Sequence, residues 1–327
     1  MKKTLKITYQ FFLILSVVAA FVPDFAYAQT WPEKPIRLIN PFAPGGFGDT
    51  VARPLLDRLA QNLGQSIIVE SHGGANGTLA SNVVARAPAD GYTLLLANLG
   101  PIAISPALQP ATTLDPLKNF VAITQLVSGP LILLVHPDVP AKNLDELLAL
   151  ALKNPGKLSY GSVGAGSTTH LAGELLSQRA GIDWLHVPYK GAAPVMTNLL
   201  GKQIDAGIVN ISLAKSYVET GRLKPIAVTT LKRSAVMPEV PAIAERIPGF
   251  EVNPWWGLMA PIGTPHAIIQ RIQDETMRLI ALPEVAERFR QSGLEPEGTT
   301  AEAFEARIRS DLKQWQDLAK TNKIVMD

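Results

Sequence analysis

Cysteine is absent from the 327-residue sequence. Structural disulfides, thiolate zinc sites, iron–sulfur clusters and cysteine nucleophiles are therefore excluded together. A lipoprotein-type anchor is excluded as well, because it needs a cysteine at the processed N-terminus. The five histidines are scattered without the spacing of a metal-binding motif, so we expect no metal.

A large excess of one charge is also lacking, since the sequence has 30 Lys and Arg residues and 28 Asp and Glu residues. Three of these lysines and Asp24 lie within residues 1–28. Without that segment the two signs balance. Proteins that bind nucleic acid carry basic patches, so we expect no nucleic-acid partner.

Long hydrophobic runs are confined to the N-terminus. Three lysines lie within residues 1–6, residues 11–22 are apolar except for Ser16, and Ala26-Tyr27-Ala28 follows. This order is typical of a secretory signal peptide, and the run is shorter than the ~20 residues of a membrane span. We predict a signal peptide at residues 1–28, cleavage after Ala28, and a periplasmic location.

Two similar α/β lobes are the simplest account of the remaining chain. Its length suits two domains of roughly 100–200 residues each, and 47% of all residues are hydrophobic. Short β-rich runs, such as residues 36–39 and 93–97, alternate with helical stretches, such as residues 168–180. This pattern predicts mainly parallel sheets covered by helices. We place one lobe at residues 29–124 and 251–327, and the other at residues 125–250.

Three helix starts carry capping signals. Asn143 with Glu146 and Thr299 with Glu302 have the spacing of a capping box. Thr264-Pro265 predicts an N-cap followed by proline at the first helical position.

Two glycine-rich loops follow predicted strands and precede predicted helices. They span residues 40–50, with Gly45, Gly46 and Gly48, and residues 160–170, with Gly161, Gly164 and Gly166. Ligands of open α/β sheets bind where such loops lead into helix N-termini. Bare amides and small hydroxyl groups suit a carboxylate, although each loop alone is equally consistent with a tight turn.

Catalytic motifs are absent from these loops. Ser162 and Ser167 lack the G-x-S-x-G context of a hydrolase, and neither a G-x-G-x-x-G nor a P-loop pattern occurs. Asp49 is interpreted as an N-cap of the first helix rather than as a general base. His170 is interpreted as a local hydrogen-bonding residue that could also lie near a bound anion.

Many collinear segments resemble one family. They include residues 31–37, 41–46, 89–94, 153–162, 170–174, 186–191, 257–261 and 283–285. With these segments the chain resembles the extracytoplasmic solute receptors of tripartite tricarboxylate transport systems, called the Bug family. The resemblance covers essentially all of the chain after the signal peptide.

The resemblance implies a two-lobed periplasmic-binding-protein fold of the Venus flytrap, type II-like kind. It implies a receptor without catalysis or cofactor, which holds a small carboxylate between the lobes and passes it to membrane permease subunits. We expect a monomer. The predicted ligand-binding residues are Pro44, Gly45, Gly46, Phe47, Asp49, Asn98, Gly166, Ser167, Thr168, His170, Tyr189 and Asn210.

Phe47 departs from the family pattern, in which a small residue and then Thr or Ser commonly follow the glycine pair. Its ring suggests a ligand with an aromatic or otherwise apolar body, because aromatic stacking contributes about 0.5–1.5 kcal/mol beyond burial. The alternative is that the ring packs within its own lobe.

Two other functions stay open from the sequence alone. One is a periplasmic hydrolase or isomerase acting on a carboxylate, which would need a nucleophile–base pair that we do not find. The other is a receptor that presents its ligand to a membrane sensor instead of a permease.

Overall fold

The computed structural model describes residues 31–41, 47–73, 77–108 and 114–321. The chain divides into two units, residues 1–33 and 34–327. The predicted signal peptide lies outside the described residues, and the following description concerns the second unit.

The first sheet has six strands in the order β11-β4-β10-β3-β1-β2. Its strands are β1 (Ile36–Asn40), β2 (Ile67–Ser71), β3 (Thr93–Asn98), β4 (Phe120–Ser128), β10 (Trp255–Pro261) and β11 (Glu295–Pro296). β1 pairs in parallel with β2 and β3, whereas β10 is antiparallel to β3 and β4. We call this sheet with its helices lobe 1.

The second sheet has five strands in the order β7-β6-β8-β5-β9. Its strands are β5 (Leu131–Val135), β6 (Ser159–Ser162), β7 (Leu185–Pro188), β8 (Ala206–Asn210) and β9 (Lys224–Val228). β6 is parallel to β7 and β8, whereas β5 is antiparallel to β8 and β9. We call this sheet with its helices lobe 2.

The prediction of two α/β lobes is confirmed, but the expected mainly parallel sheets are wrong, because both sheets are mixed. The chain leaves lobe 1 after β4 and returns to it in β10. An outgoing and a returning strand that lie side by side must run in opposite directions, which accounts for the antiparallel pair β4–β10.

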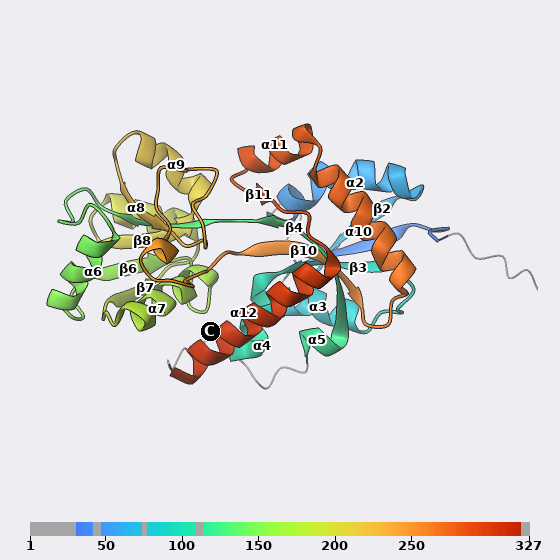
Figure 1. The fold of residues 1–327 in the computed structure, drawn as a ribbon, viewed down its shortest axis with the longest axis horizontal. Coiled ribbons are helices and arrows are strands. Elements are labelled where there is room, and N and C mark those ends of the chain that lie inside the picture. The colour runs from blue at the N-terminus through green and yellow to red at the C-terminus, as the bar shows by residue number, and fades with distance from the viewer. Residues whose placement is uncertain (1–30, 42–46, 74–76, 109–113, 322–327) are drawn as a thin grey trace, which may run out of the picture. The chain divides into compact units, whose positions relative to one another are not determined.

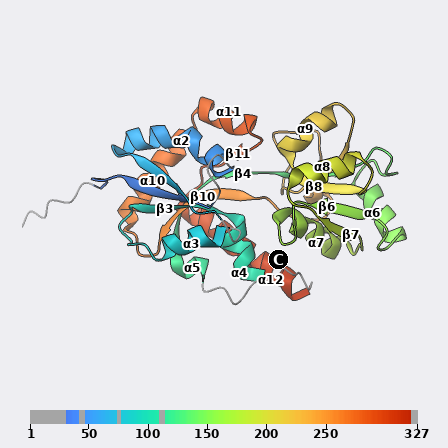
Figure 2. The ribbon, with the colours of Figure 1, turned by 180° about the vertical axis from the view of Figure 1, so that it is seen from behind.

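Helices cover both faces of the lobe 1 sheet (Figures 1 and 2). They are α2 (Phe47–Leu63), α3 (Thr78–Ala85), the π-helix η2 (Gly100–Ile104), α4 (Ser105–Leu108), α5 (Pro116–Asn119), α10 (His266–Ile280), α11 (Pro283–Gln291) and α12 (Ala301–Thr321). Leu94 and Leu96 of β3 face α2 and α10, whereas Leu95 and Ala97 pack with α3, η2 and α12. The strand is therefore buried on both sides.

Lobe 2 has the same layering. Its helices are α6 (Leu144–Lys153), α7 (Thr168–Ala180), α8 (Ala192–Leu200), α9 (Ile211–Glu219) and the short 3-10 helix η3 (Ile243–Glu245). In β5, Ile132 and Leu134 pack with α8 and α9, whereas Leu133 and Val135 pack with α6 and α7. Such continuous apolar strands are expected where helices cover both faces of a sheet.

The predicted helix starts have mixed outcomes. Asn143 caps α6, since its side chain accepts a hydrogen bond from the Glu146 N–H at 2.9 Å. The other two predictions are wrong. α10 begins at His266 with Pro265 as N-cap, and Thr264 instead donates to the Pro261 carbonyl.

Thr300 rather than Thr299 supplies the hydroxyl at the start of α12, where it accepts from the Ala303 N–H at 3.2 Å. The Thr299 hydroxyl accepts from the Gln125 N–H of β4 at 3.1 Å instead. The contact with the sheet therefore decides which threonine caps the helix.

Two crossing segments join the lobes next to each other. The first is Gly129-Pro130, between β4 and β5, and the second precedes β10 and ends at Pro254. The Gly129 N–H donates to the Pro254 carbonyl at 2.7 Å. The predicted crossing at 124–125 falls within β4, so the strand order places the first crossing four residues later.

Every helix of the described residues is too short or too polar to cross a membrane.

Candidate functional site

A cavity of about 280 Å³ lies between the two lobes. Lobe 1 contributes the end of β3, the start of η2 and the first residues of β10, and lobe 2 contributes the starts of three helices. Its lining residues are Asn98, Leu99, Gly100, Ile104, Leu131, Val163, Gly166, Ser167, Thr168, Thr169, Ala192, Asn210, Pro254, Trp255 and Trp256. No acidic side chain, Lys, Arg or His is among these described lining residues.

Residues of the second glycine-rich loop form one wall of the cavity. Ser167 is the N-cap of α7, and its hydroxyl accepts from the His170 N–H at 3.2 Å while donating to the Gly164 carbonyl at 2.6 Å. Gly166 has a φ of 72°, which favours glycine at this position. The loop is thus held in one shape by its own hydroxyl groups, and Thr168 begins the helix at the cavity.

Two histidines support this loop from below. The Gly166 N–H donates to His170 Nδ1 at 2.9 Å, and the His170 ring stacks on His186 with centroids 3.9 Å apart. His186 Nε2 lies 2.7 Å from the Ser162 hydroxyl. Burial, with a smaller contribution from His170, lowers the pKa of His186 to about 4. His186 is therefore neutral at pH 7.

This arrangement gives His170 the local hydrogen-bonding role expected of it, and it occupies one amide of the loop. His170 is buried and is not among the cavity-lining residues, so it acts as a support beneath the loop. The Gly166 N–H is already bonded to the histidine ring. Of this loop, Thr168 and the first turn of α7 therefore remain the best groups to meet a ligand.

Three helices of lobe 2 begin at the cavity. Thr168 starts α7, Ala192 starts α8 and Asn210 is the N-cap of α9. The first N–H groups of a helix have no partner within the helix, and its N-terminus carries a partial positive charge. Convergence of three such ends creates a positive potential without a charged side chain, which is suited to an anion.

Two asparagines line the cavity from opposite lobes. The Asn210 side-chain oxygen accepts from the Ser212 N–H at 3.0 Å and from its hydroxyl at 2.6 Å. Those bonds fix the amide and leave its NH₂ group as a donor. Asn98 ends β3, and its Oδ1 is buried without a hydrogen-bond partner in the described structure. Both residues were predicted from the sequence.

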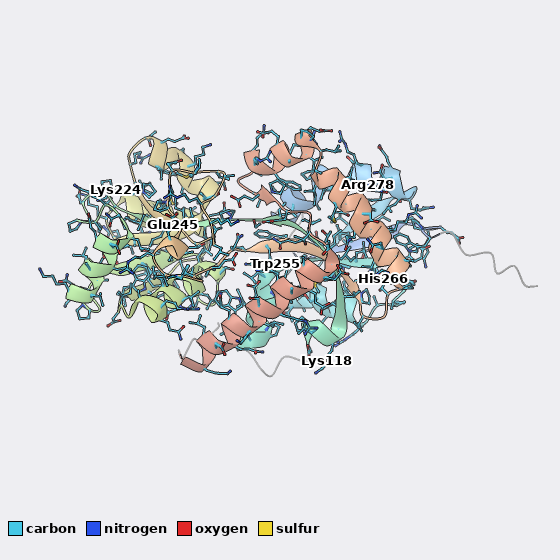
Figure 3. All side chains as sticks on the ribbon, viewed as in Figure 1. Lys118, Lys224, Glu245, Trp255, His266 and Arg278 are labelled. Carbon is cyan, nitrogen blue, oxygen red and sulfur yellow. The ribbon has the colours of Figure 1, made fainter. Side chains whose placement is uncertain are left out.

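The tandem tryptophans have different environments. Trp255 is fully buried, and its Nε1 donates to the Asp311 carboxylate of α12 at 2.7 Å. Figure 3 shows Trp255 beside this helix. Trp256 is only partly buried, and its ring lies so close to Gly129 that a β-carbon there would come within 2.9 Å of it. Trp255 is thus mainly a packing residue, whereas Trp256 forms part of the cavity wall.

Most predicted residues of the first loop cannot be placed. Pro44, Gly45 and Gly46 lie outside the described residues, as does the side chain of Phe47, the first residue of α2. Asp49 lies inside the first turn of α2, so its predicted N-cap role is wrong. Its carboxylate is 3.6 Å from Arg53, and both residues line a surface hollow separate from the cavity.

Tyr189 is not among the cavity-lining residues either. Its ring packs near Gly161, where a β-carbon would come within 3.2 Å of the ring, and burial raises its pKa.

No sequence pattern indicated the apolar part of the cavity. Leu99 follows the end of β3, Ile104 ends η2, and Leu131 begins β5 directly after the first crossing segment. The described residues contain no cluster of three or more His, Asp or Glu side chains that could hold a metal.

Comparison with known proteins agrees with this geometry. Residues 51–324 match the model of the tripartite tricarboxylate transporter family receptor, TctC. The chain is 32% identical to protein BugT of Bordetella pertussis over 314 residues, covering 94% of this chain and 96% of that protein.

Two solved structures from Rhodopseudomonas palustris are also similar. Rpa4515 with adipate is 32% identical with a TM-score of 0.73, covering 89% of this chain and 98% of that one. MatC with bound malate is 31% identical with a TM-score of 0.70, covering 88% and 100%.

The family match and the two-lobed fold confirm both the predicted resemblance and the prediction of a binding protein rather than an enzyme. The chain belongs to the tripartite tricarboxylate transporter receptor family and is a solute-binding receptor.

Proposed function

We propose that this receptor captures a small carboxylate with an apolar body in the cavity between its lobes. The observation that carries the proposal is the lining itself: three helix N-termini, hydroxyl groups and amides meet there without a charged side chain among the described residues. A carboxylate is an anion that such neutral donors can hold. The adipate and malate bound by the two similar receptors support this class of ligand.

The apolar body is supported by the apolar lining residues, which come from both lobes. Trp256, Leu131 and Ile104 face the cavity together with Leu99 and Pro254. No carboxylate among the described lining residues is available to receive an ammonium group, which argues against amino acids. Phe47, whose side chain lies outside the described residues, keeps its proposed role as an added aromatic surface.

Calorimetric titration of the chain lacking residues 1–28 tests the ligand class. The panel contains aromatic mono- and dicarboxylates, adipate, malate, succinate, citrate and glutamate. We expect the acids with apolar bodies to bind more tightly than malate and glutamate. Tighter binding of the small aliphatic acids would contradict the apolar body, and no binding of any carboxylate would contradict the function.

A Trp256→Ala variant sharpens the test. Because the partly buried Trp256 is an aromatic residue of the cavity wall, we expect about tenfold weaker binding of aromatic acids and a smaller change for malate. Leu231→Ala removes a half-exposed side chain outside the cavity and serves as the control.

The remaining parts of the proposal follow from family membership. The receptor acts in the periplasm after removal of residues 1–28 and passes its ligand to the membrane permease subunits of a tripartite tricarboxylate transporter. It works as a monomer of two lobes, residues 29–128 with 254–327 and residues 129–253. Uptake of the labelled acid in cells with and without the receptor distinguishes transport from delivery to a membrane sensor.

A further inference from the structure

The Glu295 carboxylate of lobe 1 accepts hydrogen bonds from lobe 2. Glu295 is not part of either crossing segment. Glu295 of β11 accepts a hydrogen bond from the Ser234 hydroxyl at 2.5 Å and from the Ala235 N–H at 2.9 Å. Ser234 is 1% exposed, and its oxygen also accepts from the Val236 N–H at 3.1 Å. The hydroxyl proton is thereby directed at Glu295, so that two donors of one turn hold one carboxylate oxygen.

Each partner of this contact is anchored in its own lobe. β11 pairs with β4, with Glu295 opposite Ser128, and the Ser128 hydroxyl donates to Glu297 at 2.7 Å. On the other side, Met237 and Val240, which follow Ser234 closely in sequence, are buried in the lobe 2 core with β5 and β9. The bond therefore joins two packed bodies rather than two loose loops.

A second contact lies beside the first. Gly293, with a φ of 71°, leaves so little space that a β-carbon there would lie 2.0 Å from the Ser212 β-carbon. Ser212 belongs to α9 of lobe 2, and its hydroxyl donates to the cavity-lining Asn210. Residues 293–295 of lobe 1 thus touch lobe 2 at the base of one of its cavity-facing helices.

We propose that Glu295 is a positioning residue that holds the lobes in the arrangement in which they share the cavity. Hydrogen bonds to an ionised acceptor are about twice as strong as neutral ones. Separation of the lobes must break both bonds, whereas the crossing segments at Gly129 and Pro254 stay intact as the hinge. The role in ligand capture rests on the proposed function, but the effect on the lobes does not.

The absence of cysteine allows a direct test on the ligand-free protein. Exposed Lys153 of α6 and Ala267 of α10 are replaced by cysteine in the chain lacking residues 1–28, and both sites are spin-labelled. Pulsed dipolar spectroscopy then gives the distribution of distances between the lobes. We expect one dominant distance, and in the Glu295→Gln and Ser234→Ala backgrounds about a tenfold rise in the population at longer distances.

Glu305→Gln is the matched control, since this exposed glutamate of α12 bonds only to Arg309 within its own helix. A double Glu295→Gln, Ser234→Ala protein should show little more than either single change, because the two residues form one contact. Distance distributions equal to that of the parent in both single variants would overturn the proposal, even if the variants unfold at lower temperature.

Titration with adipate separates this proposal from the proposed function. If Glu295→Gln shifts the lobe distances and binds adipate more weakly, with the change in the dissociation rate, both proposals stand. If the parent binds no carboxylate while the variant still shifts the distances, the ligand class fails and the positioning role stands.

Discussion

Single side chains that contact the binding loop set its geometry, and one of them, His186, makes the stability of the protein depend on pH. His186 is held in a stack with His170 and bonded to Ser162, and burial lowers its pKa to about 4 from the usual 6.5. A base whose pKa is lowered in the folded state binds fewer protons there than in the unfolded chain. Its contribution to stability is therefore complete above pH 6.5 and is lost as the pH falls from 6.5 toward 4.

We expect His186→Phe to reduce the loss of stability on acidification. The phenyl ring keeps the stack but does not titrate. Because His186 is only partly buried, solvent screens part of this effect. Its protonation should therefore account for about 1–2 kcal/mol of unfolding free energy lost between pH 7 and pH 4, and the variant should lose correspondingly less. Urea unfolding at pH 7, 5.5 and 4.5 measures this difference. The exposed His266→Gln variant is the control, and equal slopes for His186→Phe and the parent would contradict the assignment.

Among the secondary-structure elements, the helix N-termini are the parts of the cavity that we expect to bind the ligand. Ser167 caps α7 at the cavity, and Asn143 caps α6 by an equivalent bond away from it. Replacing either cap by alanine should lower the unfolding free energy by about 1 kcal/mol. Only Ser167→Ala should also weaken binding of the tightest acid in the panel, by about tenfold, because only that helix start meets the ligand.

Calorimetry and urea unfolding on both variants check this pair. Asn143→Ala separates a loss of overall stability from a loss of the binding loop. Equal binding by Ser167→Ala and the parent would show that the α7 N-terminus does not contact the ligand.

The helices and strands also show which elements sequence patterns can predict and which they cannot. The strands of 36–39 and 93–97 and the helix of 168–180 were predicted within a residue, because glycine-rich loops and apolar periods mark their ends. β4 was missed. All but one of its residues are largely buried, so it lacks the alternation that identifies a half-exposed strand. β11 has two residues, too few for any pattern.

The same limit applies to the cavity. Ser167, Thr168 and Asn210 were predicted because each follows a strand and precedes a helix, a relation that is local in the sequence. The roles of His170 and Trp256 depend on which strands become neighbours. Sheet order is set by packing over the whole chain, and no single segment encodes it.

For the molecule as a whole, Gly129 is a point at which side chains of both lobes come close together. A β-carbon on Gly129 would come within 2.9 Å of the Trp256 ring of lobe 1 and within 3.2 Å of the Asn210 amide of lobe 2. Both of these residues line the cavity. An alanine at Gly129 therefore acts as a wedge between the lobes at the hinge.

We expect Gly129→Ala to weaken binding of the tightest acid in the panel about tenfold, since overpacking of this kind costs about 1–3 kcal/mol. Gly207→Ala is the matched control, because its β-carbon would meet Leu199 and Val195 at 3.2 Å, wholly within lobe 2. That variant should lose stability without losing affinity. Calorimetry with both proteins decides the matter, and a loss of affinity as large for Gly207→Ala as for Gly129→Ala would mean that the hinge glycine has no special role. Weaker binding at Gly129 alone would show that the distance between Trp256 and Asn210 controls capture of the ligand.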